Sequence, residues 1–197
     1  MNTVQTAKSQ RTEAELKAAA RRLILRQGYA QTKITDITKE AGKAAGSFYR
    51  YFTDKDDLMR SLAEDFLASH RDHAHGTLGP DHRFATRDDV RAHVEAYWEN
   101  SRRHLAEMTG IFQAAQADEA FARTWESLRS HHVAMWADHI EQMRGPREDN
   151  TLTAQAIVCM LESFCYAQLR SSPENATMAI DVLTDLVMHG IAPDATP

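Results

Sequence analysis

The sequence predicts an all-α protein with a three-helix domain at the amino terminus and a larger helical domain after it. Apolar residues recur at spacings of three and four through most of the chain, as in amphipathic helices. Residues 1–56 carry six Lys and five Arg against six acids, whereas residues 57–197 carry twelve Arg and no Lys against twenty-two acids. A segment of net charge +5 before one of −10 is typical of a nucleic-acid-binding domain joined to a body that avoids the polyanion.

Length and composition are those of an ordinary globular protein. The chain has 197 residues, 43% hydrophobic and 26% charged, which is enough to bury a core. We expect a cytoplasmic protein without membrane contact, because no apolar run approaches a membrane span and no signal peptide is evident. Cys159 and Cys165 lie six residues apart in a predicted helix, too far to be bridged within it. Reduced, buried thiols are favoured over a redox sensor.

The first helix is predicted from Arg11, after a polar arm of residues 1–10. Gly28 falls where a helix would end. The cations on its polar side are explained mainly as a solvated face, with one or two phosphate contacts as the alternative. The apolar side consists of Leu16, Ala19, Ala20, Leu23 and Ile24.

Two short helices are predicted between residues 32 and 55. Gly42 supplies the turn between them, because glycine tolerates backbone angles that other residues avoid. Phe48 and Phe52 lie four residues apart and would anchor the second helix. Its outer face carries donors and flat rings, which suit phosphates and base edges. In such a helix-turn-helix unit the second helix enters the major groove. The inner face of the first helix carries Ile34, Ile37 and Ala41, and the outer face of the second carries Ser47, Tyr49, Arg50 and Tyr51.

This stretch resembles the DNA-binding module of the TetR family of bacterial transcriptional regulators. The resemblance rests on Gly28-Tyr29, Ala41-Gly42 and above all residues 46–52, G-S-F-Y-R-Y-F, followed by Asp54-Lys55, and it covers about a quarter of the chain. It implies a homodimer with two recognition helices in successive major grooves of a palindromic double-stranded DNA operator. The residues expected to face DNA or to lie close to it are Thr35, Lys43, Ser47, Tyr49, Arg50, Tyr51 and Lys55.

Two places depart from the family pattern. Lys43 and Ala44 stand where the family usually has an apolar residue and a serine cap, and loss of such a cap typically costs about 1 kcal/mol. Lys33 stands where a threonine often caps the preceding helix. We expect these changes to affect base reading, or to direct Lys43 to a phosphate, while the fold is kept.

A longer helix is predicted from about Lys55, with Thr53 as its cap and acids in its first turn. Between Ser69 and Asp88 the periodicity breaks, which predicts a loop. His70, His73 and His75 invite a metal interpretation, but no cysteine or ligand quartet of known spacing accompanies them. We therefore expect a polar linker, no metal and no cofactor.

A second helical body is predicted from Thr86 or Asp88, with one helix ending near Gly110, a short one opening at Ile111, and a long one ended by Gly145-Pro146. The apolar stripe here is rich in Trp, Met and His, which indicates either plain core or an adaptable pocket for a small hydrophobic or aromatic effector. The candidate effector-binding residues are Tyr97, Trp98, Phe112, Trp125, His132, Met135, Trp136 and His139, with Glu162 and Tyr166 as weaker candidates.

The last two predicted helices, residues 151–169 and 176–190, carry more apolar surface than one small body covers. This predicts a partner subunit, and the TetR resemblance likewise places these helices in a two-fold four-helix dimer interface. We assign residues 1–56 to the DNA-binding domain and residues 57–197 to an effector-binding and dimerisation domain.

The leading interpretation, implied by the TetR resemblance, is a ligand-responsive transcriptional repressor in which, by analogy with that family, an effector would shift the connecting helix of residues 55–70. The alternatives are a helical protein-interaction adaptor and an enzyme that uses the carboxy-terminal pocket. No H-E-x-x-H, G-x-S-x-G or phosphate-binding glycine loop is present, which disfavours an enzyme. The confinement of lysine to the amino-terminal quarter disfavours an adaptor.

Overall fold

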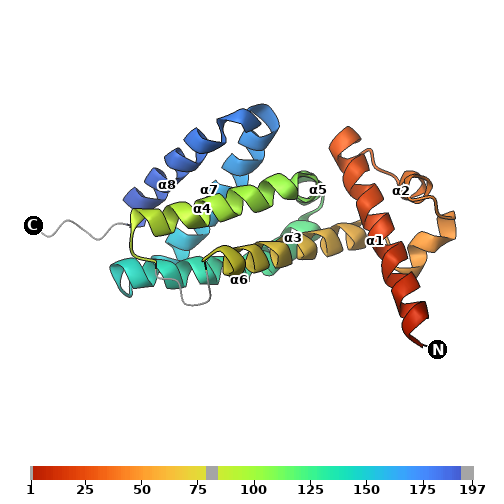
Figure 1. Ribbon diagram of the computed structural model, residues 1–197, viewed down its shortest axis with the longest axis horizontal. Coiled ribbons are helices and arrows are strands. Elements are labelled where there is room, and N and C mark those ends of the chain that lie inside the picture. Colours follow the sequence, from red (N-terminus) through yellow and green to blue (C-terminus); the bar gives the residue numbers. More distant parts are fainter. Residues whose placement is uncertain (1, 79–83, 192–197) are drawn as a thin grey trace, which may run out of the picture. The chain divides into compact units, whose positions relative to one another are not determined.

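The computed structural model describes residues 2–78 and 84–191, and every regular element within these ranges is a helix (Figure 1). The all-α prediction is thereby confirmed. The elements are α1 Asn2–Gln27, α2 Ile34–Glu40, the 3₁₀ helix η1 Ala45–Arg50, α3 Lys55–Leu78, α4 Arg87–Arg103, α5 Leu105–Ala117, α6 Glu119–Arg144, α7 Asn150–Ser171, the 3₁₀ helix η2 Pro173–Asn175, and α8 Ala176–Ile191.

The chain divides into two compact units. The first comprises Met1–Phe66 and His104–Glu126, and the second comprises Leu67–Arg103 and Ser127–Pro197. Helices α3 and α6 each contribute residues to both units. The first unit therefore contains α5 and the beginning of α6 in addition to the helix-turn-helix segment.

The core of the first unit confirms the predicted apolar faces. In this unit α1 packs against α2 and α5. Ile37 and Phe48 are completely buried, and Phe52 is nearly so. Gly110 lies inside α5 and lets this helix approach α3, because a Cβ at this position would collide with the side chain of Met59. The buried stripe of α1 is Leu16, Ala19, Ala20, Leu23 and Ile24.

Several predicted boundaries were wrong. Helix α1 begins at Asn2 instead of Arg11, because the polar residues before Arg11 include neither Gly nor Pro to interrupt it. The predicted helix end at Gly110 is wrong as well: α4 ends at Arg103, and α5 runs through the glycine, which serves close packing. The second helix of the helix-turn-helix is a 3₁₀ helix rather than an α-helix.

The predicted loop between Ser69 and Asp88 is in part helix, since α3 continues to Leu78. His70 is only 5% exposed, and its ring lies against Tyr97 and His132, so the polar-looking sequence has a buried side that supports the helix. The side chains of His73 and His75 lie outside the described residues.

In the second unit, α4 packs against α7 and α8, and α7 also packs against α8. Helix α7 is long and apolar enough to cross a membrane, with a mean hydropathy of 1.2, so the prediction that no apolar run approaches a membrane span was wrong. Core helices of soluble proteins meet the same criterion, and neighbouring helices bury 39% of the window. Leu161 and Cys165 on this helix are completely buried.

Candidate nucleic-acid interface and effector site

The helix-turn-helix is held from inside by two phenylalanines. Phe48 and Phe52 are 0% and 4% exposed, with ring centroids 5.4 Å apart. Gly42 makes the turn with a φ of +65°, a region that favours glycine. Ala44, the residue before η1, makes no side-chain capping hydrogen bond, as expected for alanine in place of serine. The aromatic anchors and the turn, rather than a cap, therefore fix the position of η1.

The predicted DNA-facing residues differ in accessibility. Tyr49 is 63% exposed, and Thr35 and Arg50 are also exposed. Ser47 and Tyr51 are half-buried, and the Tyr51 hydroxyl accepts a hydrogen bond from Ser9 at 3.5 Å. Of the predicted DNA-facing side chains, those of Thr35, Tyr49 and Arg50 are thus the most accessible to DNA.

The two lysines predicted near DNA are engaged by the protein. The Lys43 ammonium lies 2.5 Å from a Glu15 carboxylate oxygen, and this contact lowers the pKa of Glu15. The Lys55 ammonium donates to the Tyr29 carbonyl at 3.0 Å and lies 4.1 Å above the Tyr29 ring. Burial lowers the pKa of Lys55. In this structure Lys55 joins the start of α3 to the turn between α1 and α2.

The turn at Gly28 and Tyr29 also receives a side chain from α5, which the sequence did not reveal. Gln113 accepts a hydrogen bond from the Tyr29 backbone N–H at 2.6 Å. Gly28 has a φ of +81°, and a Cβ there would lie 3.0 Å from the Gln113 side-chain oxygen. The Tyr29 hydroxyl donates to Asp56, at the start of α3. This turn therefore links α1, α3 and α5 directly before the helix-turn-helix begins.

A second link between α1 and α5 is ionic. Glu107 on α5 is 1% exposed and lies 2.5 Å from Nε of Arg21 and 3.1 Å from Nδ1 of His104. Burial opposes ionisation of Glu107, but hydrogen bonds from His104 and the charge of Arg21 outweigh it, so its pKa is lowered. Arg21 also pairs with Asp65 at 2.9 Å, and Lys17 reaches the same carboxylate at 3.0 Å.

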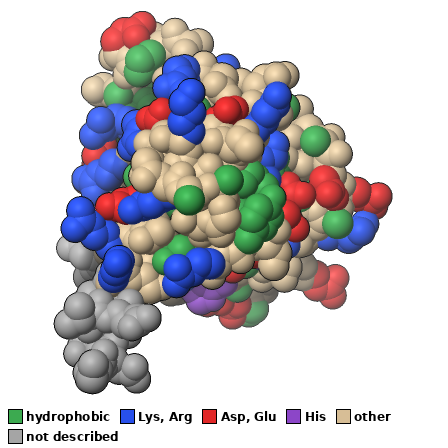
Figure 2. Space-filling view, turned by 90° about the vertical axis from the view of Figure 1, so that its right-hand side faces the viewer, with side chains coloured by type: hydrophobic (Ala, Val, Ile, Leu, Met, Phe, Trp, Pro, Cys, Tyr) green, Lys and Arg blue, Asp and Glu red, His purple; other side chains and the backbone are tan. Residues whose placement is uncertain are grey.

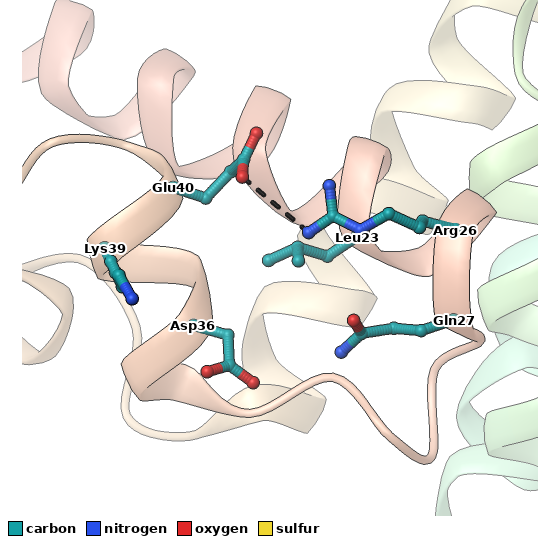
Figure 3. Close-up of a pocket in the computed structure, with 6 residues that line it drawn as sticks. All are labelled: Leu23, Arg26, Gln27, Asp36, Lys39 and Glu40. Carbon is teal, nitrogen blue, oxygen red and sulfur yellow. Dashed lines mark ion pairs between the residues drawn. The ribbon is translucent and has the colours of Figure 1, made fainter.

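The first unit contains a pocket of about 530 Å³ between α1 and α2 (Figure 3). Glu40 in its wall pairs with Arg26 at 3.8 Å, and with Arg22 at 2.8 Å. Two cations and two carboxylates line it, so it does not favour an anion over a cation. Lys and Arg side chains gather instead on the left of the face drawn in Figure 2, whereas the largest group of Asp and Glu lies on its right. The pocket is lined by Leu23, Arg26, Gln27, Asp36, Lys39 and Glu40.

The eight candidate effector residues do not all lie in one unit. Phe112 and Trp125 belong to the first unit, where the Trp125 ring lies 6.3 Å from that of Phe66. The other six belong to the second unit, and all of them except the half-buried Met135 are less than 9% exposed. These six are Tyr97, Trp98, His132, Met135, Trp136 and His139.

Rings from α3, α4 and α6 form a buried aromatic cluster in the second unit. Tyr97 and His132 stack with centroids 5.6 Å apart and planes 6° from parallel, and His70 lies 4.5 Å from His132. The Trp136 indole donates to Nε2 of His132 at 3.2 Å. Burial lowers the pKa of His132 well below its usual value, so this imidazole is neutral at pH 7.

A buried ion pair lies between α6 and α7. Arg129 donates to Glu162 at 2.9 Å and to the Cys159 sulfur at 3.4 Å. Burial raises the pKa of Glu162 to about 7, although Arg129 opposes this. Among the side chains that the structure describes, no group of three or more His, Cys, Asp or Glu is arranged to hold a metal ion.

Residues 16–62 match the model for the bacterial regulatory proteins of the tetR family. This segment is therefore a TetR-type DNA-binding module. The matched segment contains all seven residues predicted to lie at or near DNA and the side chains that anchor them. The predicted TetR-family, helix-turn-helix character is thus confirmed.

Curated relatives of this chain are named as transcriptional regulators. It is 29% identical over 122 residues to the uncharacterized regulator YvdT of Bacillus subtilis, covering 62% of this chain and 61% of YvdT. It is 27% identical over 142 residues to the regulator EthR of Mycolicibacterium smegmatis, covering 70% and 64% of the two chains. The chain thus spans less than two thirds of the length of these relatives.

Solved TetR-like structures share the fold over nearly the whole chain. The fatty acid degradation regulator FadR from Bacillus halodurans superposes with a TM-score of 0.77 at 18% identity, covering 91% of this chain and 96% of that one. FadR from Bacillus subtilis, solved with stearoyl-CoA, gives a TM-score of 0.76 at 16% identity and covers 90% and 98%. Such low identity establishes a common fold and leaves the ligand to be argued from this chain's own residues.

Proposed function

We propose that this TetR-family protein is a homodimeric transcriptional repressor that binds a palindromic operator and is released from it by a small hydrophobic or aromatic effector. The supporting observation is the family match over residues 16–62 together with the exposed Tyr49 and Arg50 on an η1 helix anchored by buried phenylalanines. Two copies would place their η1 segments in successive major grooves about 34–36 Å apart.

In the DNA complex, Tyr49 and Arg50 read base edges or phosphates, and Thr35, Ser47 and Tyr51 contact the backbone. Lys43 and Lys55 lie beside this surface and contribute positive potential, because their ammonium groups already have protein partners. Residues 1–56 act as the DNA-binding domain, and residues 57–197 carry effector binding and dimerisation.

The first test is selection of duplex DNA from a random pool by the purified protein, followed by titration of the selected site at several salt concentrations. We expect a palindrome whose affinity falls steeply with salt. Arg50→Ala should weaken binding by about 1–3 kcal/mol if it contacts a base, or reduce the salt slope by about one if it contacts a phosphate. Arg123→Ala is the matched control, since Arg123 is 65% exposed on α6. Failure to select any sequence would refute the repressor function.

Dimerisation through α7 and α8 is supported by exposed apolar side chains. Four of the six large hydrophobic residues that are exposed within the described ranges lie on these two helices. A second copy of the chain would cover them around a two-fold axis. They are Leu152, Met178, Val182 and Leu186, which are 68%, 67%, 43% and 53% exposed.

The effector is proposed to bind in the carboxy-terminal domain, at the candidate residues with apolar and aromatic side chains. Helix α3 contributes to both units, so it is the natural element for an effector to displace. The effector can weaken operator binding only if it binds more tightly to the conformation with α3 displaced than to the conformation that binds the operator. The ratio of these two affinities limits how far operator binding is weakened. The test adds candidate ligands to the operator complex, including stearoyl-CoA, which the solved FadR from Bacillus subtilis contains. A released operator identifies an effector.

A cytoplasmic, non-enzymatic role agrees with the relatives, which are named as transcriptional regulators. The adaptor and enzyme alternatives are addressed by the same selection, because neither requires a specific operator.

A further inference from the structure

Two buried hydroxyl groups on α4 have no hydrogen-bond partner among the residues that the structure describes. Tyr97 is 1% exposed and Ser101 is 0% exposed, and they lie one helical turn apart. Neither oxygen makes a hydrogen bond to the part of the chain that the structure describes. The Ser101 hydroxyl is near enough to lower the pKa of Tyr97, but the two groups do not meet hydrogen-bond geometry. Buried polar groups left unpaired are costly, so a partner that the described residues do not supply is expected.

The groups around the Tyr97 hydroxyl come from two other helices. Burial raises the pKa of the Tyr97 phenol well above its usual value, the nearby Glu162 on α7 raises it further, and Arg129 on α6 lowers it. Glu162 and Arg129 form a pair at 2.9 Å, so the guanidinium beside Tyr97 already has a partner within the protein. The other side of the tyrosine carries no charge from His132, because its ring stacks on that neutral imidazole.

We propose that the hydroxyls of Tyr97 and Ser101 form a subsite for one uncharged, hydrogen-bonding head group, such as a hydroxyl, carried on an apolar or aromatic effector. This rests on the proposed effector-responsive function and states which effectors qualify. A phenolic or alcoholic hydroxyl both donates and accepts, and so matches two hydroxyls that can do the same. A hydrocarbon leaves both unpaired, and a carboxylate or phosphate head meets an arginine already paired with Glu162.

The test uses three ligands that differ only in the head group: ethylbenzene, 4-ethylphenol and 4-ethylbenzoate. Binding to the full-length protein is measured by titration calorimetry. We expect 4-ethylphenol to bind at least tenfold more tightly than the other two. Tyr97→Phe and Ser101→Ala should each reduce this advantage at least fivefold and leave ethylbenzene binding unchanged. Thr184→Val is the control, because that buried hydroxyl donates a hydrogen bond to the Ile180 carbonyl at 2.7 Å.

The melting temperature of the ligand-free variants provides a second readout. Tyr97→Phe removes an unpaired hydroxyl and keeps the ring, so it should melt at or above the temperature of the unmodified protein. A lower melting temperature would show that the hydroxyl is satisfied inside the protein, for instance by an ordered water, and would overturn the proposal. So would 4-ethylphenol that fails to bind, or that binds no better than ethylbenzene.

The result is separable from the test of the repressor function. If an operator is selected but the head-group preference is absent, only this subsite is refuted. If 4-ethylphenol binds as expected but no operator is selected, the subsite stands as a ligand site and the repressor function fails.

Discussion

Replacing Glu107 by glutamine tests whether the buried ion pair between α5 and α1 stabilises the first unit. The carboxylate is 1% exposed and receives Arg21 at 2.5 Å and His104 at 3.1 Å. Glutamine keeps the shape and one acceptor oxygen but removes the charge. Arg21 retains Asp65 at 2.9 Å, so the substitution weakens the arrangement without leaving the guanidinium unpaired.

The expected loss follows from the burial of the pair. Hydrogen bonds to charged groups contribute about 1.5–3 kcal/mol each, and since Arg21 keeps one partner we expect Glu107→Gln to cost about 2–3 kcal/mol in all. For a chain of this length about 1 kcal/mol corresponds to a shift of roughly 2–4 °C in Tm. The variant should therefore melt about 4–12 °C lower at pH 7.

The contribution of Glu107 to stability should decrease at low pH. The pKa of Glu107 is lowered in the folded protein from its ordinary value of 4.5, so its stabilising contribution is present above that pH and is lost as the pH falls through the folded pKa. The Tm difference between the two proteins should consequently shrink as the pH is lowered below about 4.5.

The assay is thermal unfolding followed by circular dichroism at pH 7 and in steps below pH 5. Glu99→Gln is the matched control, because Glu99 pairs with Arg102 at 2.8 Å on a more exposed surface, where such pairs contribute at most about 1 kcal/mol. The reasoning is refuted if Glu107→Gln lowers the Tm no more than Glu99→Gln does, or if its deficit grows at low pH.

Three further outcomes are expected. Gly28→Ala should lower the Tm more than Gly145→Ala does. Both glycines have a φ near +80°, which costs an L-residue about 1–2 kcal/mol, but of the two only a Cβ at position 28 contacts a neighbour, the Gln113 oxygen. Equal losses of Tm would mean that the Gln113 side chain moves away at no cost. Leu186→Glu should convert the proposed dimer to a monomer in light scattering, and an unchanged mass would exclude the exposed face of α8 as the interface. Because the pKa of Glu162 is raised to about 7, the free energy of unfolding should fall as the pH rises from about 4.5 to 7. Urea unfolding of Glu162→Gln should show no such fall. If the variant keeps the same dependence on pH, another group causes it.

Local pattern predicted the features that depend on a residue and its near neighbours. The spacing of Leu16, Ala20 and Leu23 predicted the buried side of α1, and Phe48 and Phe52 predicted the anchors of the recognition segment. Gly42 marked the turn through its own backbone angle. Such features follow from helical periodicity and from the conformational freedom of single residues, so all-α architecture and the helix-turn-helix could be predicted.

Long-range packing decided the rest. From the sequence, Gly110 was expected to end a helix. In the structure it lies inside α5, because a Cβ at this position would collide with Met59 on another helix. From the sequence, His70 was expected to lie in a polar loop. In the structure it is buried against the rings of Tyr97 and His132.

The couplings between distant elements also required the tertiary structure. The contact of Gln113 with the Tyr29 backbone cannot be predicted from the sequence around either residue. The same holds for the Tyr97 hydroxyl, which has no hydrogen-bond partner among the described residues. The amino-acid pattern determined the all-α class and the TetR-type helix-turn-helix module within residues 16–62. Which polar groups meet, and which are left buried without a partner, depends on contacts between residues far apart in the chain, and these exist only once the helices have packed.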